Sequence, residues 1–169
     1  MAFVLITIRP FKNTIPLMIL RYKILFKAGF FLGERCQMSL VKALKVLVVD
    51  DMSISRGLIT QTLASVGIQN VRYAEDGREA LQKMRDDPAH LVISDYNMPN
   101  MSGIDLLYSL RQNPRTQKVG FILITGKATR QILEEGVRLK MNNYLLKPFE
   151  PDDLLRKISE VFGPLGRAA

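Results

Sequence analysis

The sequence has one cysteine, one histidine and no tryptophan among its 169 residues. A single cysteine excludes a disulfide framework and a cysteine-rich metal site, and it suits a reducing compartment. The single histidine, His90, directly precedes a predicted strand and has no other candidate functional residue beside it, so we expect it to have a structural role. The chemistry of this chain therefore has to be sought among its carboxylates, hydroxyls and amines.

Long hydrophobic runs are absent from the first 42 residues, although this segment is apolar. Its longest uncharged runs, Met1–Ile8 and Asn13–Leu20, have eight residues each. A membrane-spanning helix needs roughly 18–20 mostly apolar residues, so neither run predicts a span. Pro10 and Lys12 interrupt the apolar stretch and no small-residue cleavage site follows, which is not typical of a secretory signal.

Acidic residues are scarce in the same segment. Residues 1–42 contain 7 Lys and Arg against 1 acid, a net charge of +6, whereas residues 43–169 contain 17 against 15, a net of +2. The total of +8 would suggest a nucleic-acid partner if it were spread over a folded domain. Because most of it lies in the first 42 residues, we expect no nucleic-acid partner.

This difference in composition predicts a boundary, with an N-terminal extension at 1–42 and a domain at 43–169. Two interpretations of the extension stay open. In the first, Met38 is an ordinary start shortly before the first strand, and the upstream residues come from a misassigned translation start. Alternatively, the extension is a disordered or membrane-contacting arm, broken into pieces by Pro10, Pro16 and Gly29.

From residue 43 onward, short apolar runs typical of buried strands alternate with apolar residues at helical spacing. A composition that is 47% hydrophobic and 24% charged is that of a globular domain. Five strands alternating with five helices predict an α/β fold, a doubly wound five-stranded parallel sheet with helices on both faces. The predicted strands cover 45–49, 70–74, 91–94, 119–124 and 143–146, and the predicted helices cover 53–66, 77–85, 104–111, 129–139 and 151–162.

Polar side chains stand at the ends of four predicted strands. These are Asp50 and Asp51 after the first, Asp95 after the third, Thr125 after the fourth and Lys147 after the fifth. The carboxyl ends of parallel strands share one edge, so these side chains are expected to converge. Carboxylates so close together repel unless a cation intervenes, and Mg²⁺ suits oxygen ligands. One Asp is then able to act as nucleophile toward a phosphoryl group.

Four segments at these strand ends together resemble the receiver domain of two-component response regulators. The resemblance covers residues 43 to about 163, and the stretch 97–101 is similar to the CheY-like, single-domain branch of that family with its flavodoxin-like fold. Four elements in the right order and spacing are specific, whereas an Asp-Asp pair alone would not be. The segments are Val48–Asp51, Asp95–Gly103, Ile124–Gly126 and Tyr144–Phe149.

The resemblance implies a role for each residue of the predicted site. Asp95 would be the phospho-acceptor, and Asp50, Asp51, Asp95 and the backbone carbonyl of Asn97 would hold Mg²⁺. Lys147 would pair with the acceptor carboxylate and then with the phosphoryl group, and a cis Lys147–Pro148 bond would direct it there.

The resemblance also implies a switch and a partner-binding face. Thr125 would move to bond the phosphoryl group and Tyr144 would turn into the vacated space. Lys127 departs from CheY, where an acid stands near the phosphate, which leaves the dephosphorylation rate and any phosphatase open. The face expected to bind partners contains Lys127, Arg130, Leu146, Phe149 and Lys157.

The implied function is that of a cytoplasmic single-domain response regulator. A sensor histidine kinase would phosphorylate it, and phosphorylation would control protein binding, in chemotaxis at the flagellar motor switch. It would not be an enzyme beyond assisting its own phosphorylation and dephosphorylation. A phosphorelay intermediate or phosphate sink remains an alternative. A hydrolase of the haloacid-dehalogenase type is a further one, but that family has Asp-x-Asp after its first strand and residues 50–52 lack this spacing.

Overall fold

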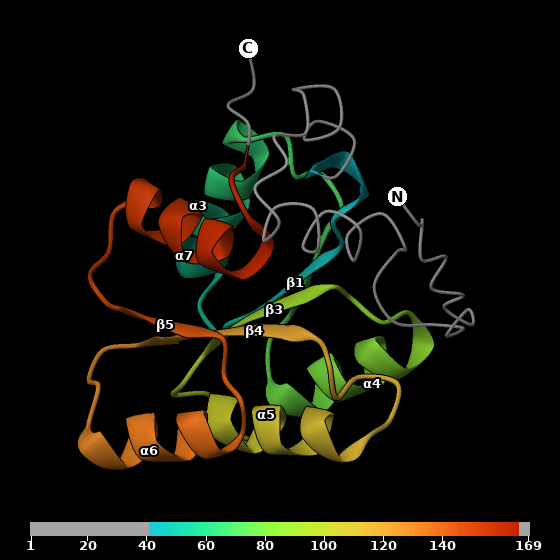
Figure 1. Ribbon diagram of the computed structural model, residues 1–169, viewed down its shortest axis with the longest axis vertical. Helices are drawn as coiled ribbons and strands as arrows, with labels where there is room; N and C mark the ends of the chain where they lie inside the picture. The colour runs from blue at the N-terminus through green and yellow to red at the C-terminus, as the bar shows by residue number, and fades with distance from the viewer. Residues whose placement is uncertain (1–40, 166–169) are drawn as a thin grey trace, which may run out of the picture.

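A computed structural model describes residues 41–165, and these form a sheet between two layers of helices (Figure 1). Expectations for residues 1–40 lie outside the described part of the chain. All five strands are parallel, in the order β2-β1-β3-β4-β5, which confirms the predicted doubly wound sheet. The strands are β1 (Val46–Val49), β2 (Val71–Ala74), β3 (Leu91–Asp95), β4 (Gly120–Thr125) and β5 (Asn143–Leu146).

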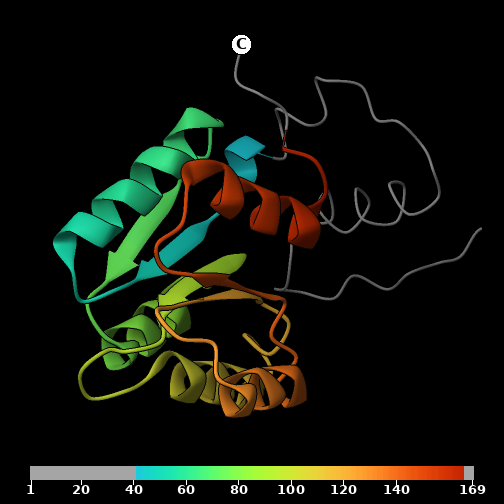
Figure 2. The same cartoon turned by 90° about the vertical axis from the view of Figure 1, so that its left-hand side faces the viewer.

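The labelled helices lie in two layers, one on each face of the sheet, as Figures 1 and 2 show from perpendicular directions. The chain leaves β1 toward β2 on one side and then crosses to β3 on the other, so the winding reverses between β1 and β3. Binding sites in such folds form at this reversal. Helices α3 (Ser53–Ser65) and α7 (Pro151–Phe162) form the first layer, and α4 (Gly77–Asp86), α5 (Gly103–Gln112) and α6 (Arg130–Arg138) form the second.

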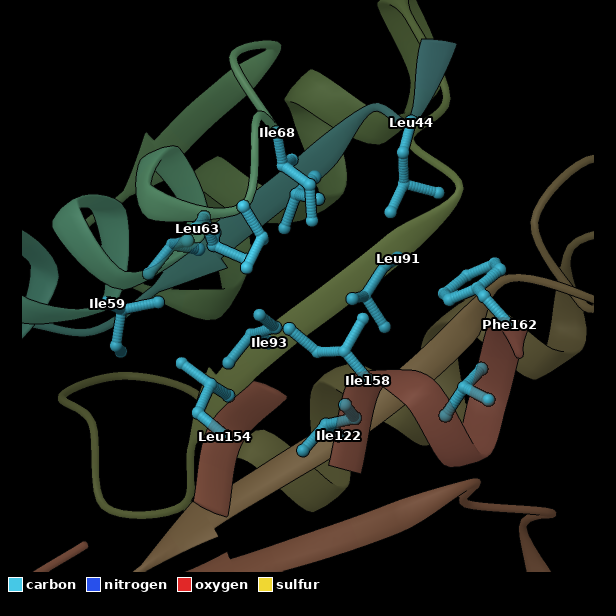
Figure 3. Packing of buried hydrophobic residues seen from close by; sticks show 14 of the residues in the cluster. Leu44, Ile59, Leu63, Ile68, Leu91, Ile93, Ile122, Leu154, Ile158 and Phe162 are labelled. Atoms are coloured by element: carbon cyan, nitrogen blue, oxygen red, sulfur yellow. The ribbon is translucent and has the colours of Figure 1, made fainter. Parts of the chain in front are cut away.

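The central strands are buried on both faces, which explains their continuous apolar sequences. All four residues of β1 are fully buried. On the side of α3 and α7, branched aliphatic side chains of the sheet meet Leu63, Ile158 and Phe162 in one cluster (Figure 3). Each fully buried side chain of this size contributes roughly 1.5–3 kcal/mol by leaving water, so this packing holds α3 and α7 against the sheet.

The packed core begins slightly before the boundary that the sequence suggests. Residues 41–43 are helical, and Val41 is 4% exposed within the cluster beneath α3 and α7. Its side chain lies beside Gly67, whose φ of 85° lets the chain turn at the end of α3. Val41 therefore packs with the domain although it precedes residue 43.

His90 has a structural position at the amino-terminal edge of the sheet, as we expect from the sequence. Its Nδ1 accepts a hydrogen bond from the backbone N–H of Lys45, 2.9 Å away, where the chain enters β1. The charged groups nearby are the Lys45 ammonium and the Asp87 carboxylate, which are 2.7 Å apart. Burial of the ring lowers the pKa of His90, and the charge of Lys45 acts in the same direction.

We predict that His90 makes the fold less stable as the pH falls from 7 toward 5. In the unfolded chain the His90 imidazole binds a proton near pH 6.5, whereas in the folded chain its pKa is lower. Protonation of His90 therefore favours unfolding below that pH. Urea unfolding at several pH values should show a steeper loss of stability in the native sequence than in His90→Gln. Because the chain has no other histidine, equal slopes would contradict the proposed role of this ring.

Candidate functional site

The carboxyl ends of the central strands bring three polar residues together in a buried position. Asp50 follows β1 and is 1% exposed, Asp95 ends β3 and is 7% exposed, and Thr125 ends β4 and is 2% exposed. β1 and β3 are hydrogen-bonded neighbours, so their ends are adjacent although 45 residues separate the two aspartates. The convergence predicted from the sequence is therefore present.

Lys147 joins the two buried carboxylates with one ammonium group. Its Nζ lies 2.5 Å from Oδ1 of Asp95 and 3.2 Å from Oδ2 of Asp50. Burial on its own lowers the pKa of Lys147, but the hydrogen bond to Asp95 and the charges of both carboxylates outweigh burial and raise the pKa above its usual value. Lys147 is therefore charged throughout the neutral range. The peptide bond between Lys147 and Pro148 is cis, as expected from the sequence.

Asp50 is further fixed by the start of α3. Its Oδ1 accepts the backbone N–H of Met52 at 2.8 Å, and its Oδ2 accepts the hydroxyl of Ser55 at 2.6 Å. Arg56 donates to the backbone carbonyl of Asp50 at 2.7 Å and also pairs with Glu75. Ser55 and Arg56 support the site without any sequence motif that marks them, because their contacts depend on how α3 leaves β1.

The loop after Asp95 is closed by short hydrogen bonds at both ends. Oδ2 of Asp95 accepts the backbone N–H of Asn97 at 2.7 Å, and the N–H of Gly103 donates to the carbonyl of Tyr96 at 3.0 Å. A Cβ at Gly103 would overlap the carbonyl oxygen of Asp95, so only glycine permits α5 to begin so close to β3. Asp95 thereby has one oxygen bound to its own loop and the other to Lys147.

Asp51 differs from its neighbour because its side chain is exposed. Within residues 41–165 its carboxylate forms no hydrogen bond or ion pair, and it lines the same cleft as Asp95 and Asn97. In that part of the chain no three His, Cys, Asp or Glu side chains form a ready metal cluster. Mg²⁺ needs only one or two carboxylates and keeps several waters, so a free carboxylate beside Asp95 fits this ion.

Thr125 and Lys127 form a tight turn at the end of β4. The hydroxyl of Thr125 accepts the backbone N–H of Lys127 at 3.2 Å and donates to the Lys127 carbonyl at 3.1 Å. Gly126 between them has open space where a side chain would stand. The Lys127 side chain is exposed and forms no ion pair within the described residues.

The residues of the expected partner face lie on or beside α6, β5 and α7. Tyr144 on β5 is half-buried and packs against the core beneath α4, α5 and α6. Leu146 is 46% exposed, and Phe149 is partly buried against the other core cluster. Arg130 is exposed and forms an ion pair with Glu134 on the same helix. Nζ of Lys157 lies 3.6 Å from Oε2 of Glu160.

An open cleft of about 870 Å³ leads to this group of residues. It runs from Asp51 and Asp95 past Thr125 and Lys127 to the inner side of α6 at Ile132. The Asp95 carboxylate lines this accessible cleft and is paired with the Lys147 ammonium. A carboxylate in such a position is able to accept a charged group from another molecule.

This fold and this arrangement of strand-end residues define the class of protein. Residues 46–159 match the response regulator receiver domain family, and the chain belongs to that family. The match includes all five strands and every predicted site residue. No helix among residues 41–165 is long and apolar enough to cross a membrane.

Among relatives, the chain is similar to chemotaxis regulators. It is 41% identical to the probable chemotaxis protein CheY of Rhizobium etli over 128 residues, which are 76% of this chain and 99% of that protein. It is 34% identical to chemotaxis protein CheY-3 of Vibrio cholerae, over 72% and 93% of the two chains. The structure of Vibrio cholerae CheY4 superimposes with a TM-score of 0.66 at 33% identity, covering 70% and 98%. The domain is thus a CheY-like receiver domain of two-component signalling.

We predict that Lys147→Met lowers the free energy of unfolding by about 3 kcal/mol without divalent ions, because it leaves two buried carboxylates unneutralised. Part of this loss should return when Mg²⁺ is added. Lys127→Met is the matched control, since it removes an unpaired ammonium from the same cleft and should change stability by less than about 0.5 kcal/mol. Equal stability of Lys147→Met and the native chain would contradict this role for the ammonium.

Proposed function

We propose that this protein is a cytoplasmic response regulator that takes a phosphoryl group from a histidine kinase onto Asp95. The observation that carries the proposal is the single Lys147 ammonium between the carboxylates of Asp95 and Asp50. Asp95 ends β3 at the base of an open cleft, so a donor is able to reach it while its neighbours remain fixed. The CheY-like relatives support the same assignment.

Mg²⁺ would be held by Asp50, Asp51 and Asp95 with the backbone carbonyl of Asn97. When bound, the ion would neutralise charge on the transferring oxygens. Asp51 has its carboxylate free for this task, whereas Asp50 is already oriented by Met52 and Ser55. In this arrangement Asp50 also keeps Lys147 in place when the Asp95 carboxylate is consumed.

In the transfer, a carboxylate oxygen of Asp95 forms a bond to phosphorus while the nitrogen–phosphorus bond of the donor phosphohistidine breaks. The imidazole of the donor keeps the electron pair of that bond. Lys147 then passes from the Asp95 carboxylate to the new phosphoryl oxygens, which carry about −1.5 to −2 charge. While Asp95 is a free carboxylate, its hydrogen bond and the charges of Asp95 and Asp50 raise the pKa of Lys147, so the ammonium is charged when the transfer begins.

Thr125 and Tyr144 would change position in response to phosphorylation. The Thr125 hydroxyl donates to the carbonyl of Lys127 in this structure, so bonding a phosphoryl oxygen requires that this donation is given up. The turn to α6 would shift, and Tyr144 on the neighbouring strand would turn inward. A local change in charge would thereby reshape the face of α6, β5 and α7, which is a two-state element.

The output that we propose is protein binding in chemotaxis, at the flagellar motor switch. The exposed Leu146 offers apolar contact, and Lys127 and Arg130 suit an acidic partner segment. A phosphorelay intermediate or phosphate sink would use the same acceptor without such binding. A hydrolase would instead turn over phosphate esters.

Incubation with Mg²⁺ and acetyl phosphate should give an acid-stable, base-labile adduct on the protein, because an acyl phosphate forms on Asp95. Asp95→Asn should abolish it. Asp105→Asn is the matched control. Asp105 lines the same cleft, but its carboxylate is hydrogen-bonded in the capping box of α5. Mass spectrometry of the intact protein measures the adduct, and an unchanged yield in Asp95→Asn would refute the assignment.

A peptide from the flagellar motor switch should bind the phosphorylated protein more tightly than the unphosphorylated one. Leu146→Ala should weaken this binding by about fivefold to tenfold, the effect of removing an apolar interface contact. Val137→Ala is the control, because Val137 is 75% exposed in the last turn of α6, away from the acceptor. Binding that is indifferent to phosphorylation would favour a relay or sink.

A further inference from the structure

The loop between β3 and α5, residues 96–102, is attached at its apex to a helix that carries none of the predicted site residues. Asn100 has a φ of 64°, in the left-handed region that asparagine tolerates better than most residues. From this position its Nδ2 donates to Oδ2 of Asp76 at 3.0 Å. We call residues 96–102 the acceptor loop.

Asp76 serves two elements with its two carboxylate oxygens. Oδ1 accepts the backbone N–H groups of Arg78 and Glu79, each at 2.9 Å, and so caps the amino terminus of α4. Oδ2 accepts the amide of Asn100. The hydrogen bond from Glu79 and then that from Asn100 lower the pKa of Asp76, so the carboxylate is ionised at neutral pH.

A second contact joins the same loop to the same helix end. A Cβ built on Gly77 would lie 2.7 Å from Cγ and Sδ of Met101, so the methionine rests directly on the backbone of the first residue of α4. Met101 follows Asn100 in the chain. The apex of the acceptor loop is thus held by a polar contact and a packing contact, one residue apart.

These contacts bear on Asn97, whose carbonyl is the proposed backbone ligand of Mg²⁺. The N–H of Asn97 is bound to Asp95 at 2.7 Å, which fixes one end of the short stretch that contains the carbonyl. The other end is fixed three residues later, where Asn100 is bound to Asp76. The short stretch that contains the Asn97 carbonyl is therefore held at both ends, and the second hold is a hydrogen bond to the N-cap residue of α4.

We propose that Asp76 and Asn100 are positioning residues, which tie the acceptor loop to α4 and so orient the Asn97 carbonyl toward Mg²⁺. This inference rests on the proposed function, since it concerns the metal of that site. Neither side chain touches the acceptor carboxylate. Their effect is exerted through the loop backbone, in the way that outer hydrogen-bond partners orient metal ligands.

The test reverses the polarity of the hydrogen bond. Asp76→Asn keeps an oxygen for the α4 cap but presents an amide to the amide of Asn100, and Asn100→Asp presents a carboxylate to the carboxylate of Asp76. In the double variant Asp76→Asn/Asn100→Asp, the amide at 76 again donates to a carboxylate at 100. Asparagine and aspartate both tolerate the left-handed position, and the double variant keeps the net charge of the native pair.

Calorimetric titration of the full-length, unphosphorylated proteins with Mg²⁺ should show about tenfold weaker binding in each single variant. The double variant should return to within about threefold of the native chain, because the two changes are coupled. Asn100→Asp is informative on its own, since its added negative charge would strengthen Mg²⁺ binding if simple attraction were decisive. Urea unfolding should show all three variants to be folded.

Each result supports or overturns the inference. Weaker binding in both single variants with recovery in the double variant supports it. If the native chain binds Mg²⁺ and the single variants bind equally well, or the double variant is as weak as they are, the positioning role is wrong and the proposed function stands. Stronger binding in Asn100→Asp would also overturn it. If the native chain binds no Mg²⁺, both the inference and the metal of the proposed function fall.

Discussion

The ammonium of Lys147 between two buried carboxylates is the interaction on which the rest of the site depends. Asp50 and Asp95 lie side by side because β1 and β3 are paired, and without a cation they would repel each other in a poorly hydrated position. Lys147 reaches them from β5, the outermost strand on that side of the sheet. The contacts of this one side chain therefore depend on the order of β1, β3, β4 and β5, because these are the strands that bring Lys147 beside both carboxylates.

Much of this arrangement could be predicted from the sequence, because it follows from strand periodicity. Strands of four to six residues that are buried throughout are mainly apolar, and the polar residues at or directly after their carboxyl ends lie at the common edge. The ends of helices were less predictable. Helix α5 begins at Gly103 and α6 at Arg130, because Ser102 and Thr129 cap them from outside the helix. Such shifts of one residue leave the site unchanged.

The supporting contacts could not be predicted, because they join residues through space without a repeating pattern. Ser55 donates a hydrogen bond to Asp50 only because of the direction in which α3 leaves the end of β1. The spacing of the two residues in the sequence does not predict that contact. Asn100 and Asp76 are 24 residues apart on two loops whose relative position comes from the packing of α4 and α5. Residues that supply charge are recognisable by type, whereas residues that orient them are recognisable only in the folded chain.

The balance of charge explains why a phosphoryl group would alter α6 rather than stay confined to the edge of the sheet. Asp50, Asp51 and Asp95 carry three negative charges against one on Lys147, and a bound Mg²⁺ would make the group neutral. Phosphorylation replaces the charge of Asp95 by about −1.5 to −2, so the excess needs a further donor or cation. Among the described residues that line the cleft, the Thr125 hydroxyl hydrogen-bonds only within its own turn, and the exposed Lys127 ammonium forms no ion pair. Both belong to the connection that leads directly to the Thr129 cap of α6, which is why the proposed switch acts on the start of that helix.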